Sequence, residues 1–471
     1  MAKLADALDL GSSPARGGGS SPFSCTIKKR SSISMVHSEN NNQSNLVLTL
    51  NQRDNQHFQA SITIAQPFVE TMYKKALISQ QEQASTYGFS KGTTPLTYVE
   101  YAFKPNIIEH LKEFFFNHCV FNFLGKELIR HKFVVAGDPK LVDIVINPPH
   151  EACFVFDLIH VTPVIKNEWK KLNFKAPERK NYKDLDRQVE AFIKEEHENS
   201  TRIVTDTIKL GDWVCFDLRL IDSEGKPLLE NHINKLWIKM SDEEADQDVH
   251  ELFLNKKIGD RFFTTNNFLQ YYISDSLDTQ YAFEIHIVGC VPHIFFSLEQ
   301  FKRHFKLKST KETHLKLIEV FSYRNDLSQR RETIEATLKL LLNHHPINVP
   351  EDLIVRQQKL VLDAVHINPD YHVYKSQHDF KEKVRKLAEK QLKEKVFIDY
   401  VSYQENITTD DDDMISYINL LKRPRTKEFI YFDLPPTKVN GQETPIAQEI
   451  LQQFCLREKT LNHIIYYLTK R

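Results

Sequence analysis

The chain has 471 residues, of which 41% are hydrophobic and 27% are charged. This length exceeds what a single hydrophobic core organises, so we expect two to four domains, and the composition excludes a largely disordered chain. The 62 basic and 63 acidic residues give a formal net charge of −1, which excludes a global field drawing the protein onto nucleic acid or an anionic membrane.

The chain's six cysteines predict neither a disulfide framework nor a zinc site. They are Cys25, Cys119, Cys153, Cys215, Cys290 and Cys455. No two of them form a CxxC pair, and most lie in apolar runs, which is typical of buried thiols in a reducing compartment. No run of residues is apolar enough to span a bilayer, and no apolar segment follows Lys3 as in an export signal. We therefore expect a cytoplasmic protein.

Residues 1–45 are low in complexity and predicted to be disordered, since their Gly, Ser and Asn runs cannot bury apolar surface. Two interpretations of this segment stay open. It is either a flexible tail, or translation starts at Met35 and the preceding residues are an annotation artefact.

Residues 46–140 predict a small α+β head domain. Apolar residues alternate with polar ones from Phe58 to Ile64, as in a half-buried strand. Pro67 then opens an amphipathic helix. A loop with two glycines, Tyr87–Pro95, separates this helix from a strongly apolar one at Ile107–Leu128.

Residues 141–200 are predicted to be a linker or arm. The pattern from Val142 to Phe174 is strand-like and is punctuated by prolines, and Asp184–Glu198 forms a polar amphipathic helix.

Residues 201–291 predict a small antiparallel sheet. The predicted strands are Trp213–Leu220, Lys235–Met240, Asp260–Thr264 and Tyr281–Val288. Because Asp184–Glu198 before this domain and Pro292–Ser297 after it are linker-like, we expect the domain to be separable from the rest.

Residues 292–471 predict a helical, charged region poor in glycine. The predicted helices are Leu298–Asn343, Glu351–Val365, Asp379–Tyr403, Asp412–Leu421 and Ile446–Leu468. Long amphipathic helices with few turn residues favour extended arms over a tight globule.

The motifs of common enzyme classes are missing. The sequence has no GxxxxGK[ST] phosphate loop, no GxGxxG after a strand, no HExxH and no GxSxG. Its 20 histidines are scattered, and the pair His344 and His345 is interpreted as a surface pair. We therefore predict no cofactor and no metal ion.

The loop residues Gly88, Phe89, Ser90, Lys91 and Gly92 are the most informative segment. Two glycines four residues apart favour a tight turn that presents one apolar and one cationic side chain. Such a pair suits docking on a surface of protein and phosphate, while the alternative is that Phe89 packs into its own domain.

The strand Ile62–Ile64, the helix segment Tyr73–Leu77 and the loop Gly88–Pro95 together resemble the ribosome-binding domain of the trigger factor family. That family carries a Gly-Phe-Arg-x-Gly-x-x-Pro loop. Ser90 stands where the family has Arg and cannot supply a bidentate phosphate contact, so Lys91 would carry more of the binding.

Three further segments resemble the same family. Leu210–Asp217 and Lys257–Phe262 are similar to parts of its FKBP-like prolyl isomerase domain, and Ile347–Ile354 is similar to the start of its chaperone arm. The resemblance implies an α+β multidomain fold with a ribosome-binding head, an FKBP-like antiparallel β domain and an extended helical C-terminal body with arms.

The isomerase pocket that the resemblance implies is eroded. Leu218 stands where the family has an aromatic residue, and Ser241–Asn255 lacks the Pro and Gly of the family's pocket segment. Candidate wall residues are Phe283, Tyr271 and Tyr272, with ordinary sheet core as their alternative role. We therefore expect the domain with weak or no peptidyl-prolyl isomerase activity, since catalysis needs an apolar, aromatic-lined pocket.

By resemblance, the function is that of an ATP-independent chaperone that docks near the exit tunnel of the large ribosomal subunit and binds unfolded nascent polypeptides, without membrane contact and with a weak homodimer as a further expectation. Two alternatives stay open: an exported prolyl-isomerase chaperone of the periplasmic type, and a helical scaffold protein with a degenerate isomerase domain.

Overall fold

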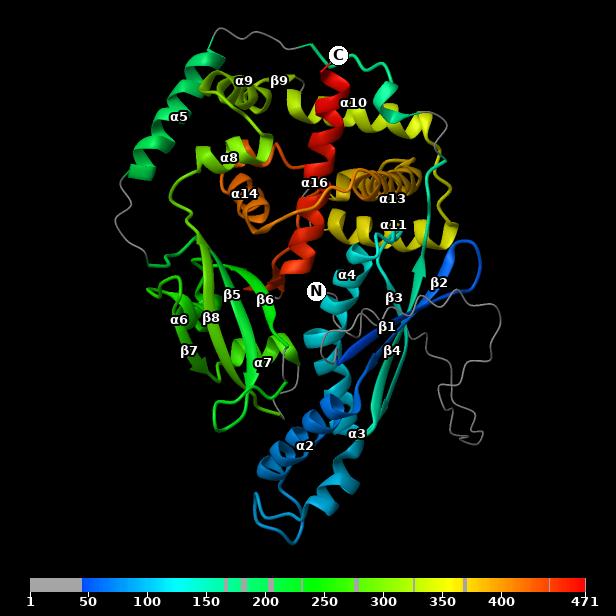
Figure 1. The fold of residues 1–471 in the computed structure, drawn as a ribbon, viewed down its shortest axis with the longest axis vertical. Helices are drawn as coiled ribbons and strands as arrows, with labels where there is room; N and C mark the ends of the chain where they lie inside the picture. The colour runs from blue at the N-terminus through cyan, green and yellow to red at the C-terminus, as the bar shows by residue number, and fades with distance from the viewer. Residues whose placement is uncertain are drawn as a thin grey trace. The chain divides into compact units, whose positions relative to one another are not determined.

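The structure is a computed structural model, and its chain divides into two compact units (Figure 1). It describes residues 45–164, 168–178, 184–201, 207–229, 232–274, 279–324, 327–366, 371–439 and 441–470. Unit 1 holds the described residues of 45–128, 137–160 and 273–279, and unit 2 holds the remainder. The predicted tail of residues 1–45 lies outside the described residues except for Asn45.

Unit 1 is built on a four-stranded antiparallel sheet in the order β1-β2-β4-β3. The strands are β1 (Leu46–Gln52), β2 (His57–Ile64), β3 (Lys140–Asn147) and β4 (Glu151–Ile159). On β2, the side chains of Ala60, Ile62 and Ile64 are fully buried and alternate with partly exposed polar ones. One face of the sheet is therefore core, as the period of two in the sequence predicts.

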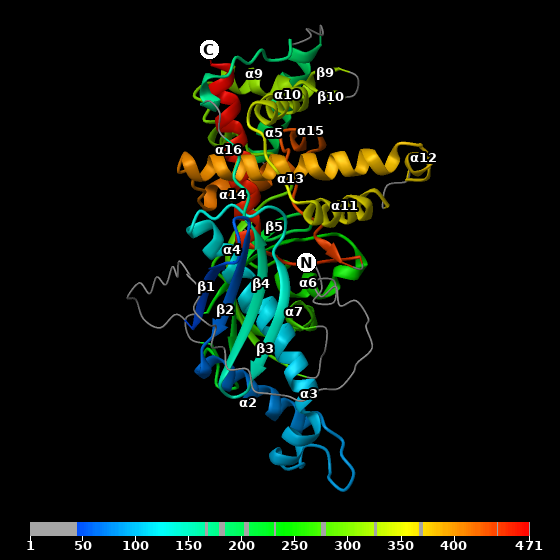
Figure 2. The same cartoon turned by 90° about the vertical axis from the view of Figure 1, so that its right-hand side faces the viewer.

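The helices of unit 1 follow the hairpin β1–β2, and the first two of them, α2 and α3, pack against each other. They are α2 (Gln66–Gln83), α3 (Leu96–Phe115), the π-helical turn η1 (Phe116–Val120) and α4 (Phe121–Arg130). α2 begins with Pro67 in its first turn, where the missing N–H costs nothing. Figure 2 shows the loop between α2 and α3 at the end of this helix pair that points away from the strands.

The strands β3 and β4 differ from the prediction that residues from 141 onward form a linker. β4 pairs with β2 along its whole length, from His57 opposite Ile159 to Ile64 opposite Ala152. This pairing joins segments about 90 residues apart, and local periodicity reports strand character without naming the partner. The head domain therefore continues to Ile159.

The sheet of unit 2 has the order β13-β6-β5-β8-β7 and is antiparallel throughout. Its elements are β5 (Trp213–Ile221), β6 (Asn234–Lys239), α6 (Gln247–Phe253), β7 (Arg261–Thr264), α7 (Asn267–Ile273), β8 (Ala282–Val291) and β13 (Ile446–Ala447). β5 to β8 correspond to the four predicted strands. The fifth strand comes from the C-terminal region, with Ile446 opposite Trp237 and Ala447 opposite Leu236.

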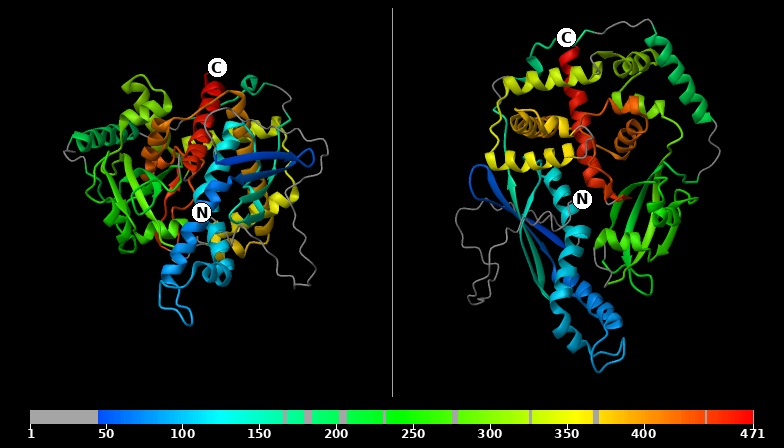
Figure 3. Two further views of the ribbon diagram at one scale, coloured as in Figure 1. Left: turned by 60° about the horizontal axis from the view of Figure 1, so that its bottom comes forward. Right: turned by 180° about the vertical axis from the view of Figure 1, so that it is seen from behind.

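The other described elements of unit 2 are mostly helical. They are η2 (Trp169–Lys171), α5 (Leu185–Thr201), η3 (Glu244–Asp246), α8 (Leu298–Phe305), α9 (Thr310–Phe321), β9 (Tyr323–Arg324), β10 (Leu327–Ser328), α10 (Gln329–His344), α11 (Glu351–His366), α12 (Tyr371–Lys375), α13 (Phe380–Gln404), α14 (Asp411–Leu421), α15 (Pro424–Lys427), β11 (Lys438–Val439), β12 (Gln442–Glu443) and α16 (Gln448–Thr469). α16 runs past α13 and α14 (Figure 3, right).

The stretch predicted as helical from Leu298 to Asn343 holds three helices, α8, α9 and α10. Each starts at a serine whose hydroxyl accepts a hydrogen bond from a backbone N–H in the first turn, namely Ser297, Ser309 and Ser328. Such caps satisfy donors that the helix itself leaves open. The apolar periodicity continues across the breaks between the helices and therefore does not reveal them. The capping serines are the sequence signal that would have marked where each helix begins.

The β-rich and helical parts of unit 2 share one hydrophobic core, contrary to the expectation of a separable β domain. Its buried members include Trp213, Cys215, Trp237, Val291, Phe296, Phe301, Leu317, Tyr417, Ile446, Leu451 and Cys455. These residues come from β5, β6, β8, α8, α9, α14, β13 and α16. Removing the sheet would expose the helical part's own core to water.

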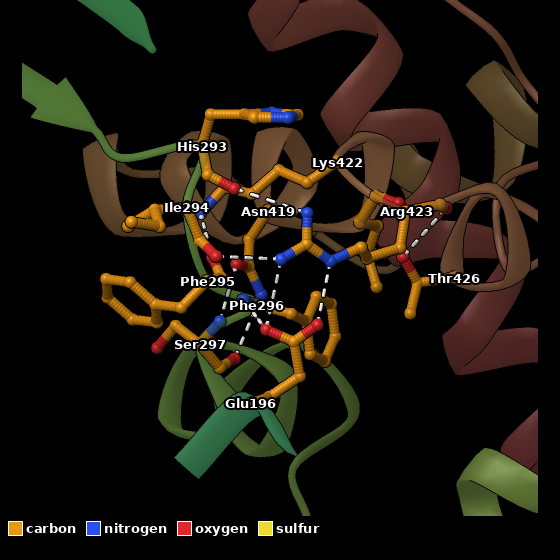
Figure 4. A network of polar contacts seen from close by, with 11 residues as sticks. Glu196, His293, Ile294, Phe295, Phe296, Ser297, Asn419, Lys422, Arg423 and Thr426 are labelled. Atoms are coloured by element: carbon orange, nitrogen blue, oxygen red, sulfur yellow. Dashed lines mark hydrogen bonds and ion pairs between the residues drawn. The ribbon is translucent and has the colours of Figure 1, made fainter. Parts of the chain in front are cut away.

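An ion pair fastens α5, the segment after β8 and α15 together (Figure 4). The Arg423 guanidinium donates to both carboxylate oxygens of Glu196, at 2.7 and 3.2 Å, and to the carbonyl oxygens of His293 and Ile294, at 3.3 and 2.9 Å. The Glu196 carboxylate also accepts the N–H of Phe296 at 2.5 Å, and its side chain is only 3% exposed. We call Arg423 and Glu196 the clamp. The segment Pro292–Ser297, predicted to be a linker, is thus bound by both members of the clamp.

Replacing Arg423 with Met should destabilise unit 2 by about 3 kcal/mol, because the buried Glu196 carboxylate loses its cation. The midpoint of urea unfolding, followed by tryptophan fluorescence, measures this. The control is Arg385→Met, which breaks the exposed pair between Arg385 and Glu351 at 2.6 Å and should cost less than about 1 kcal/mol. Equal losses in the two variants would contradict the importance of the clamp.

Candidate functional site

The loop of residues 84–95 between α2 and α3 is a tight turn whose shape depends on two glycines. Gly88 and Gly92 have φ angles of 86° and 83°, in the left-handed region that residues with a Cβ rarely adopt. A Cβ at either position would meet nothing within 4 Å, so the requirement is conformational and not one of space. Across Gly92, the N–H of Thr93 donates to the Ser90 carbonyl at 3.0 Å.

The base of this loop is anchored while its tip is open. The Gln81 side chain donates to the Thr94 carbonyl at 2.6 Å, and the hydroxyls of Thr86 and Thr94 lie 2.7 Å apart. Thr94 is fully buried. A fixed base with free side chains at the tip is suited to binding a partner without refolding.

The structure places Phe89 and Lys91 at this tip, together with the exposed Ser90. Phe89 is 41% exposed and its ring centroid lies 6.0 Å from that of Tyr98, so it leans on its own domain and still offers one side. Lys91 is exposed, and in the described part of the chain no carboxylate lies within ion-pair distance of it. Both side chains are available to a partner.

Sequence reasoning missed three exposed tyrosines near the loop. Tyr87 is fully exposed, and Tyr98 and Tyr101, one turn apart on α3, are 45% and 87% exposed. Tyr98 and Tyr101 are three residues apart at the start of the helix that follows the glycine loop, and this spacing could have indicated an exposed aromatic pair. We call Tyr87, Phe89, Lys91, Tyr98 and Tyr101 the tip surface.

The candidate isomerase residues do not gather around a described cavity. Phe283 is fully buried on β8, opposite Leu220 of β5 and Thr264 of β7. On α7, Tyr272 is buried and Tyr271 is 52% exposed. None of the three candidate side chains lines the cavity described below.

The space between the sheet and α6 is filled. Phe253 of α6 is fully buried, and its ring centroid lies 4.9 Å from that of Phe216 on β5. Leu218, where the resemblance would place an aromatic wall, is also fully buried. The side chains on this face of the sheet therefore pack against the helix as core.

A protease-coupled assay on an X-Pro peptide should show acceleration of less than about tenfold over the uncatalysed isomerisation, which takes tens to hundreds of seconds. The reason is that Phe216 and Phe253 are packed as core on the face of the sheet toward α6, where an isomerase pocket would have to stay open. Tyr271→Ala, at an exposed position, is the matched variant. Robust turnover that falls in this variant would contradict the prediction and show that Tyr271 belongs to a working pocket.

The described residues hold no group of three or more His, Cys, Asp or Glu side chains that could bind a metal ion. His344 is exposed as expected, but His345 is fully buried and stacks on Phe397 with centroids 5.5 Å apart. Burial lowers the pKa of His345. The interpretation as a surface pair is thus wrong for His345, which lies just beyond the end of α10.

The described cysteines fit the expectation of packed thiols. Cys119, Cys153, Cys215 and Cys455 are buried, Cys290 is half-buried, and Cys25 lies outside the described residues. Burial raises the pKa of both Cys215 and Cys290 to about 12, which keeps these thiols protonated and unreactive.

None of the described helices is long and apolar enough to cross a membrane.

Two family models match the chain, and they lie on either side of residues 196–315. The N-terminal model of the bacterial trigger factor protein matches residues 47–195, and the C-terminal model matches residues 316–423. No curated protein matches the chain. A solved structure described as "Promiscuous Substrate Recognition in Folding and Assembly Activities of the Trigger Factor Chaperone" is 13% identical, with a TM-score of 0.36, and the alignment covers 89% of this chain and 99% of that one.

An α+β multidomain chain that carries both models in order is a protein-folding chaperone. The chain belongs to the trigger factor family.

Proposed function

We propose that the protein is a ribosome-associated, ATP-independent chaperone of the cytoplasm that binds unfolded nascent polypeptides. The observation that carries this proposal is the tip surface on the anchored loop and the start of α3. It presents exposed aromatic side chains and a lysine that pairs with no carboxylate among the residues that the structure describes. In this assignment the head (46–140, with its sheet extended to Ile159) docks, residues 201–291 form a nominal isomerase domain, and residues 292–471 bind clients.

The docking partner is the large ribosomal subunit near the exit of its tunnel. A surface of protein and RNA phosphate offers apolar contacts for Phe89 and an anionic environment for Lys91. Because Ser90 replaces the family's Arg, the cation is a single ammonium point charge and not a planar fork. Docking should therefore be weaker and more sensitive to salt than docking through an arginine.

Replacing both Phe89 and Lys91 with Ala should reduce ribosome co-sedimentation roughly tenfold or more, since an aromatic and a charge-assisted contact are lost together. The melting temperature should hardly change, because both side chains are exposed. Co-sedimentation equal to that of the unmodified protein would overturn the docking assignment.

Client binding is assigned to the pair α11 and α13 with the short α12. The pair has a small core of its own, formed by Val361, Val384 and Ala388. Four apolar side chains on the same helices remain exposed: Val355 at 54%, Leu360 at 50%, Val373 at 62% and Leu387 at 41%. We call these four residues the arm surface. Exposed apolar side chains on a helix pair with a small core of its own can bind many different unfolded chains weakly.

Changing all four residues of the arm surface to Ser should weaken suppression of aggregation of a denatured model protein by more than about tenfold. Each side chain buried on binding contributes roughly 1 kcal/mol, and each factor of ten corresponds to about 1.4 kcal/mol.

The two variants control one another. The arm variant should co-sediment with ribosomes normally, and the Phe89 and Lys91 variant should suppress aggregation normally in the absence of ribosomes. Loss of both activities in either variant, or unchanged suppression by the arm variant, would contradict the division of roles.

A further inference from the structure

A cavity in unit 2, separate from the tip surface and the arm surface, is lined by an excess of cations. It measures about 300 Å³, near the lower end of the range for small-ligand pockets. It is lined by Trp213, Lys239, His293, Leu421, Lys422, Lys427, Asp433, Leu434, Pro435, Pro436 and Thr437. These residues come from β5, β6, the segment after β8, the α14–α15 region and residues 433–437. We call it the basic cavity.

Two of its three lysines have no carboxylate partner. In the described part of the chain, no carboxylate lies within 4.0 Å of the ammonium of Lys239 or Lys422, whereas Lys427 makes a long 3.9 Å pair with Asp433. Lys422 donates to the carbonyl oxygen of Phe295 at 3.2 Å, which leaves donors of its ammonium for a ligand.

The carboxylates nearest to Lys422 are already engaged. Asp212 accepts the N–H groups of His293 and Lys209, at 2.7 and 2.9 Å, and Glu196 belongs to the clamp. Burial first, and then repulsion from Arg423, lowers the pKa of Lys422 to about 8, against the pull of Asp212 and Glu196. An anion in the cavity would relieve this cost.

The remaining wall is largely apolar. Trp213 is 7% exposed and belongs to the shared core, and Leu434, Pro435 and Pro436 face the same cavity. His293 adds a ring whose pKa is lowered by burial and by nearby cations, so it is a neutral hydrogen-bonding group at neutral pH. A ligand that satisfies both walls carries an anionic group and an apolar one.

We propose that the basic cavity binds a small organic carboxylate with an apolar substituent, held by Lys239 and Lys422 against Trp213 and Pro435. This is the chemistry of the C-terminal residue of a peptide and equally of a free acid of that size. The proposal does not depend on ribosome docking or on the arm surface.

Isothermal titration calorimetry with three probes tests the recognition. N-acetyl-leucine should bind about tenfold or more tightly than its amide, which has the same shape without the charge, and more tightly than inorganic phosphate, which has charge without the apolar group. Lys239→Gln and Lys422→Gln should each weaken N-acetyl-leucine about fivefold or more. Lys339→Gln, at an exposed position on α10, should bind normally.

Equal affinity for the acid and the amide, or unchanged affinity in both lysine variants, would overturn the proposal, as would no binding of the acid at millimolar concentration. The acetylated peptide Ala-Ala-Leu distinguishes the two ligand sources. Binding as tight as that of N-acetyl-leucine assigns the site to peptide C-termini, and exclusion of the peptide assigns it to free acids.

A proton measurement gives a second readout that a structural role of Lys422 would not move. Binding of the carboxylate should raise the pKa of Lys422. The groups that already act on this ammonium are Arg423, Asp212, Cys290 and Glu196. The other titratable groups of the cavity are Lys239, His293, Lys427 and Asp433. Titrations near pH 8 in two buffers of different ionisation enthalpy should then show proton uptake, and Lys422→Gln should remove it. Binding without proton uptake in the unmodified protein would contradict the part assigned to Lys422.

Discussion

The clamp between Arg423 and Glu196 holds unit 2 together at the point where its sheet passes into its helices. It joins residues 227 apart in the chain and occupies the carbonyl groups of the segment that follows β8. Burying two charges costs desolvation energy, and the attraction between them only roughly offsets this cost. The clamp therefore acts mainly by fixing one arrangement of the chain, and it adds little net stability. The shared core and the strand β13 pack in the same arrangement that the clamp fixes.

The clamp, β13 and the shared core each connect the sheet of unit 2 to its helices. The β-rich region therefore supports the helical body. A sheet used in this way needs a filled interior, and Phe216, Phe253 and Leu218 fill it. A catalytic prolyl pocket needs an open, apolar one. The packed side chains thus join the sheet to α6 and stiffen it, which suits a sheet that supports the helical body.

Local patterns carried most of the fold in the sequence. The alternation along β2, the β-rich composition of the run that forms β5, and the glycines at 88 and 92 predicted strands and a turn that the structure contains. Pairings over long sequence distance were not visible, such as β4 with β2 or the two-residue β13 with β6. The same holds for the candidate sites. Phe89 and Lys91 follow from the loop, whereas Trp213 and Lys422 meet only because the chain folds.

The charge pattern links these features to function. A chain of net charge −1 cannot use a global field, so each anion it binds must meet local cations without carboxylate partners. Among the described residues, Lys91 satisfies this condition at the tip surface, and Lys239 and Lys422 satisfy it in the basic cavity. The exposed Lys91 is screened by salt and exchanges readily, whereas the enclosed lysines are screened much less. Under the proposed docking, a single exposed ammonium at position 91 gives a contact that salt weakens, because Ser90 cannot supply the planar, bidentate contact of an arginine.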